Sequence, residues 1–129
     1  MAEEKKLAVY IEDNPENRTL VVRVLTAEGY DVVTAGNAKE GLAMVKNLYP
    51  VVILIDINMP EIDGFTLTAK LHEMKHLDGV PVIAITANVM KGDREKTFAA
   101  GCDGYIQKPI NVDLFPQQVA KFIKEAHTP

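Results

Sequence analysis

Five side chains that could do chemistry each stand at the end of an apolar run in this sequence. Glu12 and Asp13 follow the first run, Asp56 follows the third, Thr86 ends the fourth, and Lys108 follows the fifth. Three carboxylates, one hydroxyl and one ammonium group could together bind a divalent cation and a phosphoryl group. That chemistry requires a fold that brings the five positions together.

The stretches around these side chains alternate between strand-like and helix-like patterns. The runs of strand length are residues 7–11, 30–35, 51–55, 80–86 and 104–107. Apolar residues at helical spacing follow four of the runs, and they predict helices that begin near Pro15 and Asn37 and helices over about 65–74 and 115–126. A more polar helix is expected over about 91–100. Strands that are apolar throughout are covered on both faces, and their alternation with helices favours right-handed crossovers. We therefore predict an α/β fold with a doubly wound, five-stranded parallel sheet.

Composition limits the class of protein. With 129 residues, 47% hydrophobic and 25% charged residues, the chain fits one globular domain. We expect that domain to cover residues 1–129, with its core at about 7–126. The net charge of -4 argues against direct nucleic-acid binding. No apolar run approaches the roughly 20 residues of a membrane span, so we expect no membrane contact. The single cysteine, Cys102, suits packing in a reducing cytoplasm.

The carboxyl ends of parallel strands meet at one edge of a sheet, where doubly wound folds bind their ligands. We therefore expect Glu12, Asp13 and Asp56 to lie close together, with Thr86 and Lys108 beside them. Two like charges about 4 Å apart repel by roughly 4 kcal/mol at an effective dielectric constant near 20. Three ionised carboxylates thus need protonation or a cation among them. An all-oxygen site of this kind suits Mg²⁺, with Mn²⁺ as a substitute, whereas Ca²⁺ would need more ligands.

A metal ion and a lysine can neutralise the oxygens of a phosphoryl group, and a hydroxyl can hydrogen-bond one of them. The chain contains no serine, and Cys102 precedes the last strand, away from the acidic edge. Asp56 is therefore the natural nucleophile, and its product would be an acyl phosphate. His72 and His76 stand four residues apart, but their polar surroundings favour a solvated helix face over a metal site.

Four segments carry a resemblance to a known family. YIEDN, IDINMPEIDG, ITAN and YIQKPI occur in this order, and with them residues 7–126 resemble the CheY-like receiver domain of two-component response regulators. DivK-type single-domain regulators and the receivers of hybrid histidine kinases are the most similar in pattern. The resemblance implies the flavodoxin-like strand order 2-1-3-4-5. It also implies a signalling switch in the bacterial cytoplasm rather than an enzyme.

The same resemblance implies partners. The phosphoryl donor would be a sensor histidine kinase or a histidine phosphotransfer protein. The output would be an altered contact with a downstream protein, and a phosphorylation-dependent homodimer is a further expectation.

The resemblance also implies a metal ligand set. Asp56 would be the phosphoacceptor and would share the Mg²⁺ with its neighbours. Asp13 would bind the metal directly, and Glu12 would act through water or by orienting that shell. Asn58 would offer its backbone carbonyl.

Other residues would contact the phosphoryl group or respond to it. Lys108 would contact it, and the bond to Pro109 is one that is often cis in this family. Thr86 would swing toward a phosphoryl oxygen, and Tyr105 would follow by changing rotamer. The helix expected at 91–100 is the least apolar, so we hypothesise that it shifts with Tyr105 on phosphorylation.

Three alternatives stay open. A metal-dependent phosphohydrolase would also use an aspartyl nucleophile, but such enzymes often have an acid where Asn58 stands. An adaptor that acts without phosphorylation would have no physical need for three repelling carboxylates. A receiver excised from a larger regulator or hybrid kinase would have the same sequence features as a stand-alone one.

Overall fold

The computed structural model describes residues 6–56, 64–86 and 101–126. The strands in these ranges are β1 (Lys6–Ile11), β2 (Tyr30–Ala35), β3 (Val52–Asp56), β4 (Val82–Thr86) and β5 (Gly104–Gln107). The helices are α1 (Pro15–Ala27), α2 (Ala38–Val45), α3 (Gly64–His72) and α5 (Phe115–Ala126), with a short 3-10 helix, η1 (Lys75–Leu77). The helix expected at 91–100 lies outside the described residues.

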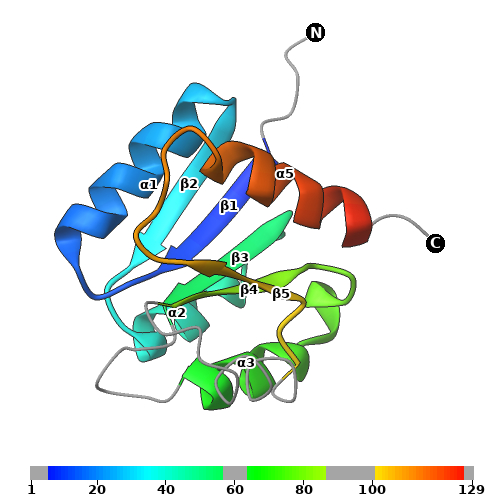
Figure 1. Cartoon of the computed structure of the whole chain (residues 1–129). Helices are drawn as coiled ribbons and strands as arrows, with labels where there is room; N and C mark the ends of the chain where they lie inside the picture. Colours follow the sequence, from blue (N-terminus) through cyan, green and yellow to red (C-terminus); the bar gives the residue numbers. More distant parts are fainter. Residues whose placement is uncertain (1–5, 57–63, 87–100, 127–129) are drawn as a thin grey trace, which may run out of the picture.

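The five strands form one parallel sheet in the order β2-β1-β3-β4-β5. Helices α1 and α5 cover one face of the sheet, and α2 and α3 cover the other (Figure 1). The prediction of a doubly wound α/β fold with strand order 2-1-3-4-5 is therefore confirmed. The central strand, β3, is buried at all five of its positions, as its apolar sequence requires.

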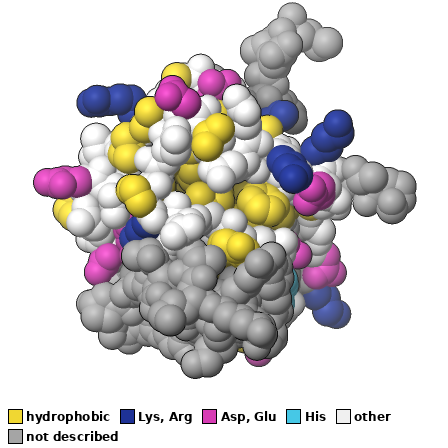
Figure 2. Space-filling view, viewed as in Figure 1, with side chains coloured by type: hydrophobic (Ala, Val, Ile, Leu, Met, Phe, Trp, Pro, Cys, Tyr) yellow, Lys and Arg dark blue, Asp and Glu magenta, His cyan; other side chains and the backbone are white. Residues whose placement is uncertain are grey.

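The core consists of two apolar clusters, one on each face of the sheet. Alternate residues of β1 contribute to different clusters: Val9 and Ile11 to the first, Ala8 and Tyr10 to the second. The second cluster includes α1 and α5 side chains, namely Val21, Leu25, Phe115, Val119 and Ile123. On the surface over α1 and α5, apolar side chains lie among charged and other side chains (Figure 2).

The helix ends follow local signals in the sequence. The side chain of Asn14 accepts hydrogen bonds from the backbone N–H of Glu16 and Asn17, which caps α1 behind Pro15. Gly29, with φ of 93°, follows the end of that helix. None of the helices in the described part of the chain has the length and apolarity needed to cross a bilayer.

Helix α3 ends two residues earlier than the pattern predicts, at His72 rather than Met74. The backbone N–H groups of Glu73 and Met74 bond to carbonyls only three residues back, so the last turn tightens. The chain then enters η1, which buries Leu77. Apolar spacing alone does not distinguish such a tightened turn from a further α-helical one.

Gly41 lets α2 approach β1 closely, and replacing it with alanine tests that packing. A Cβ at this position would lie 2.5 Å from Cδ1 of the fully buried Ile11. We expect Gly41→Ala to lower the free energy of unfolding by about 1 kcal/mol, since overpacking costs more than the gain in helix propensity. Urea unfolding measures this difference.

Two further variants separate packing from propensity. Ala43→Gly on the exposed side of α2 gives the cost of glycine in this helix. Ile11→Val removes the clashing methyl group, so it should cost less in the Gly41→Ala background than in the wild type. Equal costs in both backgrounds would contradict the close contact.

Candidate metal centre

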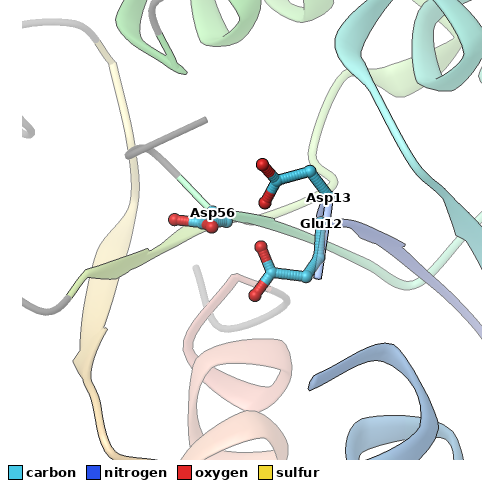
Figure 3. A group of neighbouring side chains, drawn as sticks. All are labelled: Glu12, Asp13 and Asp56. Carbon is cyan, nitrogen blue, oxygen red and sulfur yellow. The ribbon is translucent and has the colours of Figure 1, made fainter. Parts of the chain in front are cut away.

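The register of the sheet brings the acidic residues together. Ile11 at the end of β1 is paired with Ile55 in β3, so Glu12 and Asp56, the next residue of each strand, are neighbours. Asp13 follows Glu12 directly. The three carboxylates point toward a common space (Figure 3), and one oxygen of each lies within 4.8 Å of the others. The sequence expectation that these three side chains meet at one edge agrees with this geometry.

The three carboxylates differ in exposure. Glu12 is fully buried, Asp56 is 3% exposed, and Asp13 is open to solvent. Two of the three carboxylates are therefore buried and one is accessible, and the space that they face is called the cleft below. Such an arrangement suits an ion that enters from solvent and keeps part of its water shell.

Glu12 has one oxygen with several hydrogen-bond donors and one with none. Oε1 accepts from Asn17 Nδ2 at 2.7 Å, from the Tyr10 hydroxyl at 3.2 Å and from Lys108 Nζ at 3.3 Å. Oε2 is buried and has no hydrogen-bond partner among residues 6–56, 64–86 and 101–126. A buried polar atom without a partner costs free energy, so Oε2 marks a place where a ligand would stabilise the protein. The Arg18 guanidinium contacts the backbone of Glu12 and not its carboxylate: it donates to the Glu12 carbonyl at 2.7 Å.

Lys108 is shared between two carboxylates. Its Nζ lies 3.2 Å from Asp56 Oδ2 and 3.3 Å from Glu12 Oε1. Burial would lower the pKa of Lys108, but Asp56 and Glu12 outweigh that effect and raise it. The ammonium group therefore stays charged, and it offsets only part of the negative charge in the cleft.

Burial, together with the neighbouring negative charge, changes the acid–base properties of Glu12. Burial, followed by the proximity of Asp56, raises the pKa of Glu12 to about 7, against the opposing effects of Asn17 and Lys108. Burial and Glu12 also raise the pKa of Tyr10 well above its usual range, so the phenol stays a hydrogen-bond donor. A cation that pairs with these carboxylates would favour their ionised forms and displace protons.

The residues present fit a divalent metal such as Mg²⁺. In the part of the chain that the structure describes, the candidate ligand atoms are carboxylate oxygens, the buried Oε2 lacks a partner, and the Lys108 ammonium contacts two of the three carboxylates. The fourth ligand expected from the sequence, the carbonyl of Asn58, lies outside the described residues.

The remaining residues predicted for the site lie along β4 and β5. Thr86 ends β4 and is 3% exposed, and its carbonyl accepts a hydrogen bond from the Lys108 backbone N–H at 2.7 Å. Tyr105 is half-buried in β5 and packs against the cluster that includes residues of α2 and α3. The peptide bond between Lys108 and Pro109 is cis.

Three residues considered as alternative ligands or nucleophiles have structural partners elsewhere. His72 and His76 bond through Nε2 to the carbonyls of Gly101 and Val45, at 2.6 Å and 2.8 Å. Cys102 is buried, its Sγ lies 3.4 Å from the Thr68 hydroxyl, and burial raises the pKa of its thiol. These groups therefore act in packing and local hydrogen bonding.

Sequence reasoning missed Tyr10, Asn17 and Arg18, which contact Glu12. One signal was available: Tyr10 is a polar aromatic within the otherwise aliphatic run 7–11, two residues before Glu12. Strand periodicity places residues i and i+2 on the same face, so a hydroxyl there can reach the carboxylate. Asn17 and Arg18 gave no such signal, because polar residues are common in a first helical turn.

Comparisons with known proteins agree with this geometry. Residues 8–120 match the family model described as response regulator receiver domain. The polar-differentiation response regulator DivK of Brucella ovis is 36% identical over 121 residues, which cover 94% of this chain and 98% of that protein.

Solved structures give the same result. One similar structure is the receiver domain of a sensor histidine kinase from Pseudomonas aeruginosa PAO1, with a TM-score of 0.85 and 28% identity. The match covers 94% of this chain and 99% of that one. That structure has a magnesium ion coordinated in its active site cleft. The chemotaxis protein CheY4 of Vibrio cholerae has the same fold, with a TM-score of 0.88 and 24% identity over 92% of this chain and 99% of that one.

Repulsion among the carboxylates predicts that neutralising Asp13 stabilises the metal-free protein. We expect Asp13→Asn to raise the free energy of unfolding in EDTA by about 1 kcal/mol, a value reduced for the exposure of this side chain. Adding Mg²⁺ should stabilise the wild type and should stabilise Asp13→Asn much less, because a ligand is lost. Urea unfolding with and without Mg²⁺ measures both effects.

The exposed Glu73, just after α3, provides the matched control. Glu73→Gln also removes one negative charge and should leave the response to Mg²⁺ unchanged. A wild-type protein that Mg²⁺ does not stabilise would contradict a metal site at this cleft.

Proposed function

The chain belongs to the response regulator receiver domain family, and on this premise we propose that it is a signalling switch in which Asp56 accepts a phosphoryl group. The observation that carries this proposal is the position of Asp56. It ends the buried central strand, one of its oxygens lies 3.2 Å from Lys108 Nζ, and the Glu12 and Asp13 carboxylates flank it. A nucleophile at the end of a rigid strand is held for in-line attack.

The transfer step follows from these contacts. A carboxylate oxygen of Asp56 attacks the phosphorus, a new O–P bond forms, and the bond from phosphorus to the donor's leaving atom breaks. Lys108 stands where negative charge develops on the phosphoryl oxygens, and it holds Asp56 before the reaction. Glu12, Asp13 and Asp56 would hold Mg²⁺, with the Asn58 carbonyl as a further ligand and Mn²⁺ as a substitute. When bound, the metal neutralises charge on the phosphoryl oxygens and the carboxylates.

The donor and the output are part of the proposal. A sensor histidine kinase or a histidine phosphotransfer protein would supply the phosphoryl group. The DivK relatives are response regulators, and one structural neighbour is a receiver domain of a sensor histidine kinase. Residues 7–126 would act as one receiver unit in the bacterial cytoplasm, signalling through a downstream protein or a homodimer.

Thr86 and Tyr105 would transmit the change. The buried Thr86 ends the strand beside Asp56, since Asp56 and Ile85 are register partners across β3 and β4. Tyr105 lies opposite Ala84 in the neighbouring strand. A phosphoryl oxygen that accepts a hydrogen bond from Thr86 would draw its side chain toward Asp56 and change the space next to Tyr105.

Phosphorylation of Asp56 can be tested directly by intact-mass spectrometry after incubation with acetyl phosphate and Mg²⁺. We expect the mass of the wild type to increase by one phosphoryl group, because the cleft pairs a carboxylate nucleophile with a lysine and a metal site. Asp56→Asn should gain nothing, since an amide oxygen is a poor nucleophile and forms no acyl phosphate.

The exposed Asp78, which lies beyond η1, serves as the matched control. Asp78→Asn should be phosphorylated to the wild-type extent. Loss of the mass gain in EDTA is also expected. A wild type that gains no mass while still binding Mg²⁺ would contradict phosphorylation of this site by small donors and favour an adaptor role.

Thr86→Ala separates phosphorylation from its transmission. This variant should still accept the phosphoryl group, because Asp56, Lys108 and the carboxylates are intact. The NMR signals of the Tyr105 ring should shift on phosphorylation of the wild type and should shift much less in the variant. Equal shifts of the Tyr105 signals in both proteins would contradict a role of Thr86 in transmitting the change.

A further inference from the structure

We propose that Tyr10 and Asn17 are positioning residues that hold one oxygen of Glu12, so that the other is presented to the bound cation. This inference rests on the proposed function, because it assigns a task to two residues beside the same cleft. Neither residue is a metal ligand in this proposal.

Among the described residues, the side-chain hydrogen bonds to the Glu12 carboxylate converge on one oxygen. Asn17 Nδ2 at 2.7 Å and the Tyr10 hydroxyl at 3.2 Å both donate to Oε1, while Oε2 is buried and accepts no hydrogen bond from that part of the chain. A glutamate has one more rotatable bond than an aspartate, so its carboxylate can take more orientations. Two donors that converge on one oxygen remove that freedom and fix the direction in which Oε2 points.

The two donors stand on rigid elements. Tyr10 lies in β1, and its ring is fully buried among the residues of the cluster under α1 and α5. Asn17 lies in the first turn of α1, where the Asn14 cap fixes the backbone through a hydrogen bond of 3.1 Å to the Asn17 N–H. Groups held in this way lose little further entropy when they order a neighbour.

Lys108 also contacts Oε1, but it cannot serve the same purpose throughout the reaction. Its Nζ is shared with Asp56 at 3.2 Å, and the proposed function requires it to contact the phosphoryl group. Tyr10 and Asn17 have no such second task at the cleft. They would keep Glu12 oriented when Lys108 changes its partner.

The charge of the donors supports this role. A second cationic donor at Oε1, in addition to Lys108, would further repel a divalent ion a few ångströms away, whereas a phenol and an amide add no net charge. The Tyr10 hydroxyl donates to Oε1 at 3.2 Å from a fully buried ring. Hydrogen-bond partners of this kind tune metal sites, and their removal typically costs about 10-fold or more in metal affinity.

A purely structural role is the competing explanation. In that case Tyr10 would fill the core and use a nearby carboxylate as an acceptor, and Asn17 would be a surface residue of α1. Removing either donor would then change stability without changing Mg²⁺ affinity. The two explanations therefore differ in a measurable quantity.

The test measures Mg²⁺ affinity by isothermal titration calorimetry and by NMR titration of the backbone amides. Tyr10→Phe removes only a hydroxyl and keeps the ring, and Asn17→Ala removes the amide. We expect each variant to weaken Mg²⁺ binding by about 10-fold, and the double variant to weaken it further. Affinity within twofold of the wild type in both single variants would overturn the proposal.

Two control variants match these changes. Tyr30→Phe also removes a buried tyrosine hydroxyl, but Tyr30 begins β2 at the opposite end of the sheet. Thr19→Ala removes a hydroxyl that donates within α1, to the Pro15 carbonyl at 3.0 Å. Both controls should bind Mg²⁺ as the wild type does, and weakened binding in either would overturn the assignment to Tyr10 and Asn17.

Phosphorylation by acetyl phosphate gives a second readout. At limiting Mg²⁺ the two variants should react about 10-fold more slowly than the wild type, and the rates should recover as Mg²⁺ is raised, because only metal affinity is reduced. A rate deficit that persists at saturating Mg²⁺ would overturn a role in presenting Glu12 to the metal. If Tyr10→Phe fails to fold, Asn17→Ala decides alone, since its side chain is only half-buried on the surface helix.

The outcomes separate this inference from the proposed function. A wild type that binds Mg²⁺ but gains no phosphoryl group would contradict the function, while loss of Mg²⁺ affinity in the variants would still support the positioning role. A phosphorylated wild type with unchanged affinity in both variants would overturn the positioning role alone. A wild type that binds no Mg²⁺ would overturn both.

Discussion

The mutual repulsion of three carboxylates is the constraint on which the rest of the structure depends. Glu12, Asp13 and Asp56 present oxygens within 4.8 Å of one another, and Lys108 bridges two of them. At such distances each like-charge pair costs on the order of a few kcal/mol at the effective dielectric constant of a protein. The surrounding fold must supply that free energy and must prevent the side chains from turning away. The electrostatic free energy of such a group of carboxylates is unfavourable without a cation and becomes favourable when a cation binds among them.

The sheet meets this constraint through burial and register. Strands β1 and β3 are covered on both faces, so the position of each carboxylate is fixed by apolar packing rather than by the charges themselves. The pairing of Ile11 with Ile55 brings Glu12 beside Asp56. A slip of one residue would separate the two carboxylates and turn the apolar side chains of one strand to the wrong faces, which the two clusters would resist. The same apolar residues that form the core therefore also define the site.

Much of this architecture could be predicted from the sequence, because it depends on patterns that a linear chain displays. Apolar runs mark the strands, and the residues that end or follow them mark the edge at which Glu12, Asp56 and Lys108 meet. Side-chain geometry could not be obtained in this way. The sharing of Lys108 between two carboxylates and the convergence of Tyr10 and Asn17 on Oε1 depend on rotamers and on the approach of α1 to β1. The early end of α3 at His72 likewise depends on tightened backbone bonds that apolar spacing does not encode.

Lys108 contacts the acidic residues through its side chain and strand β4 through its backbone. Its ammonium group contacts Glu12, which follows β1, and Asp56, which ends β3. Its backbone N–H donates to the Thr86 carbonyl at the end of β4. It also follows β5 directly, three residues after Tyr105. A further negative charge on Asp56 would alter the electrostatic balance at this ammonium group, and the backbone that carries it is bonded to the strand next to Tyr105. The electrostatic balance at the carboxylates and the packing at β5 therefore share a residue, so a change in one acts on the other without a long chain of intermediates.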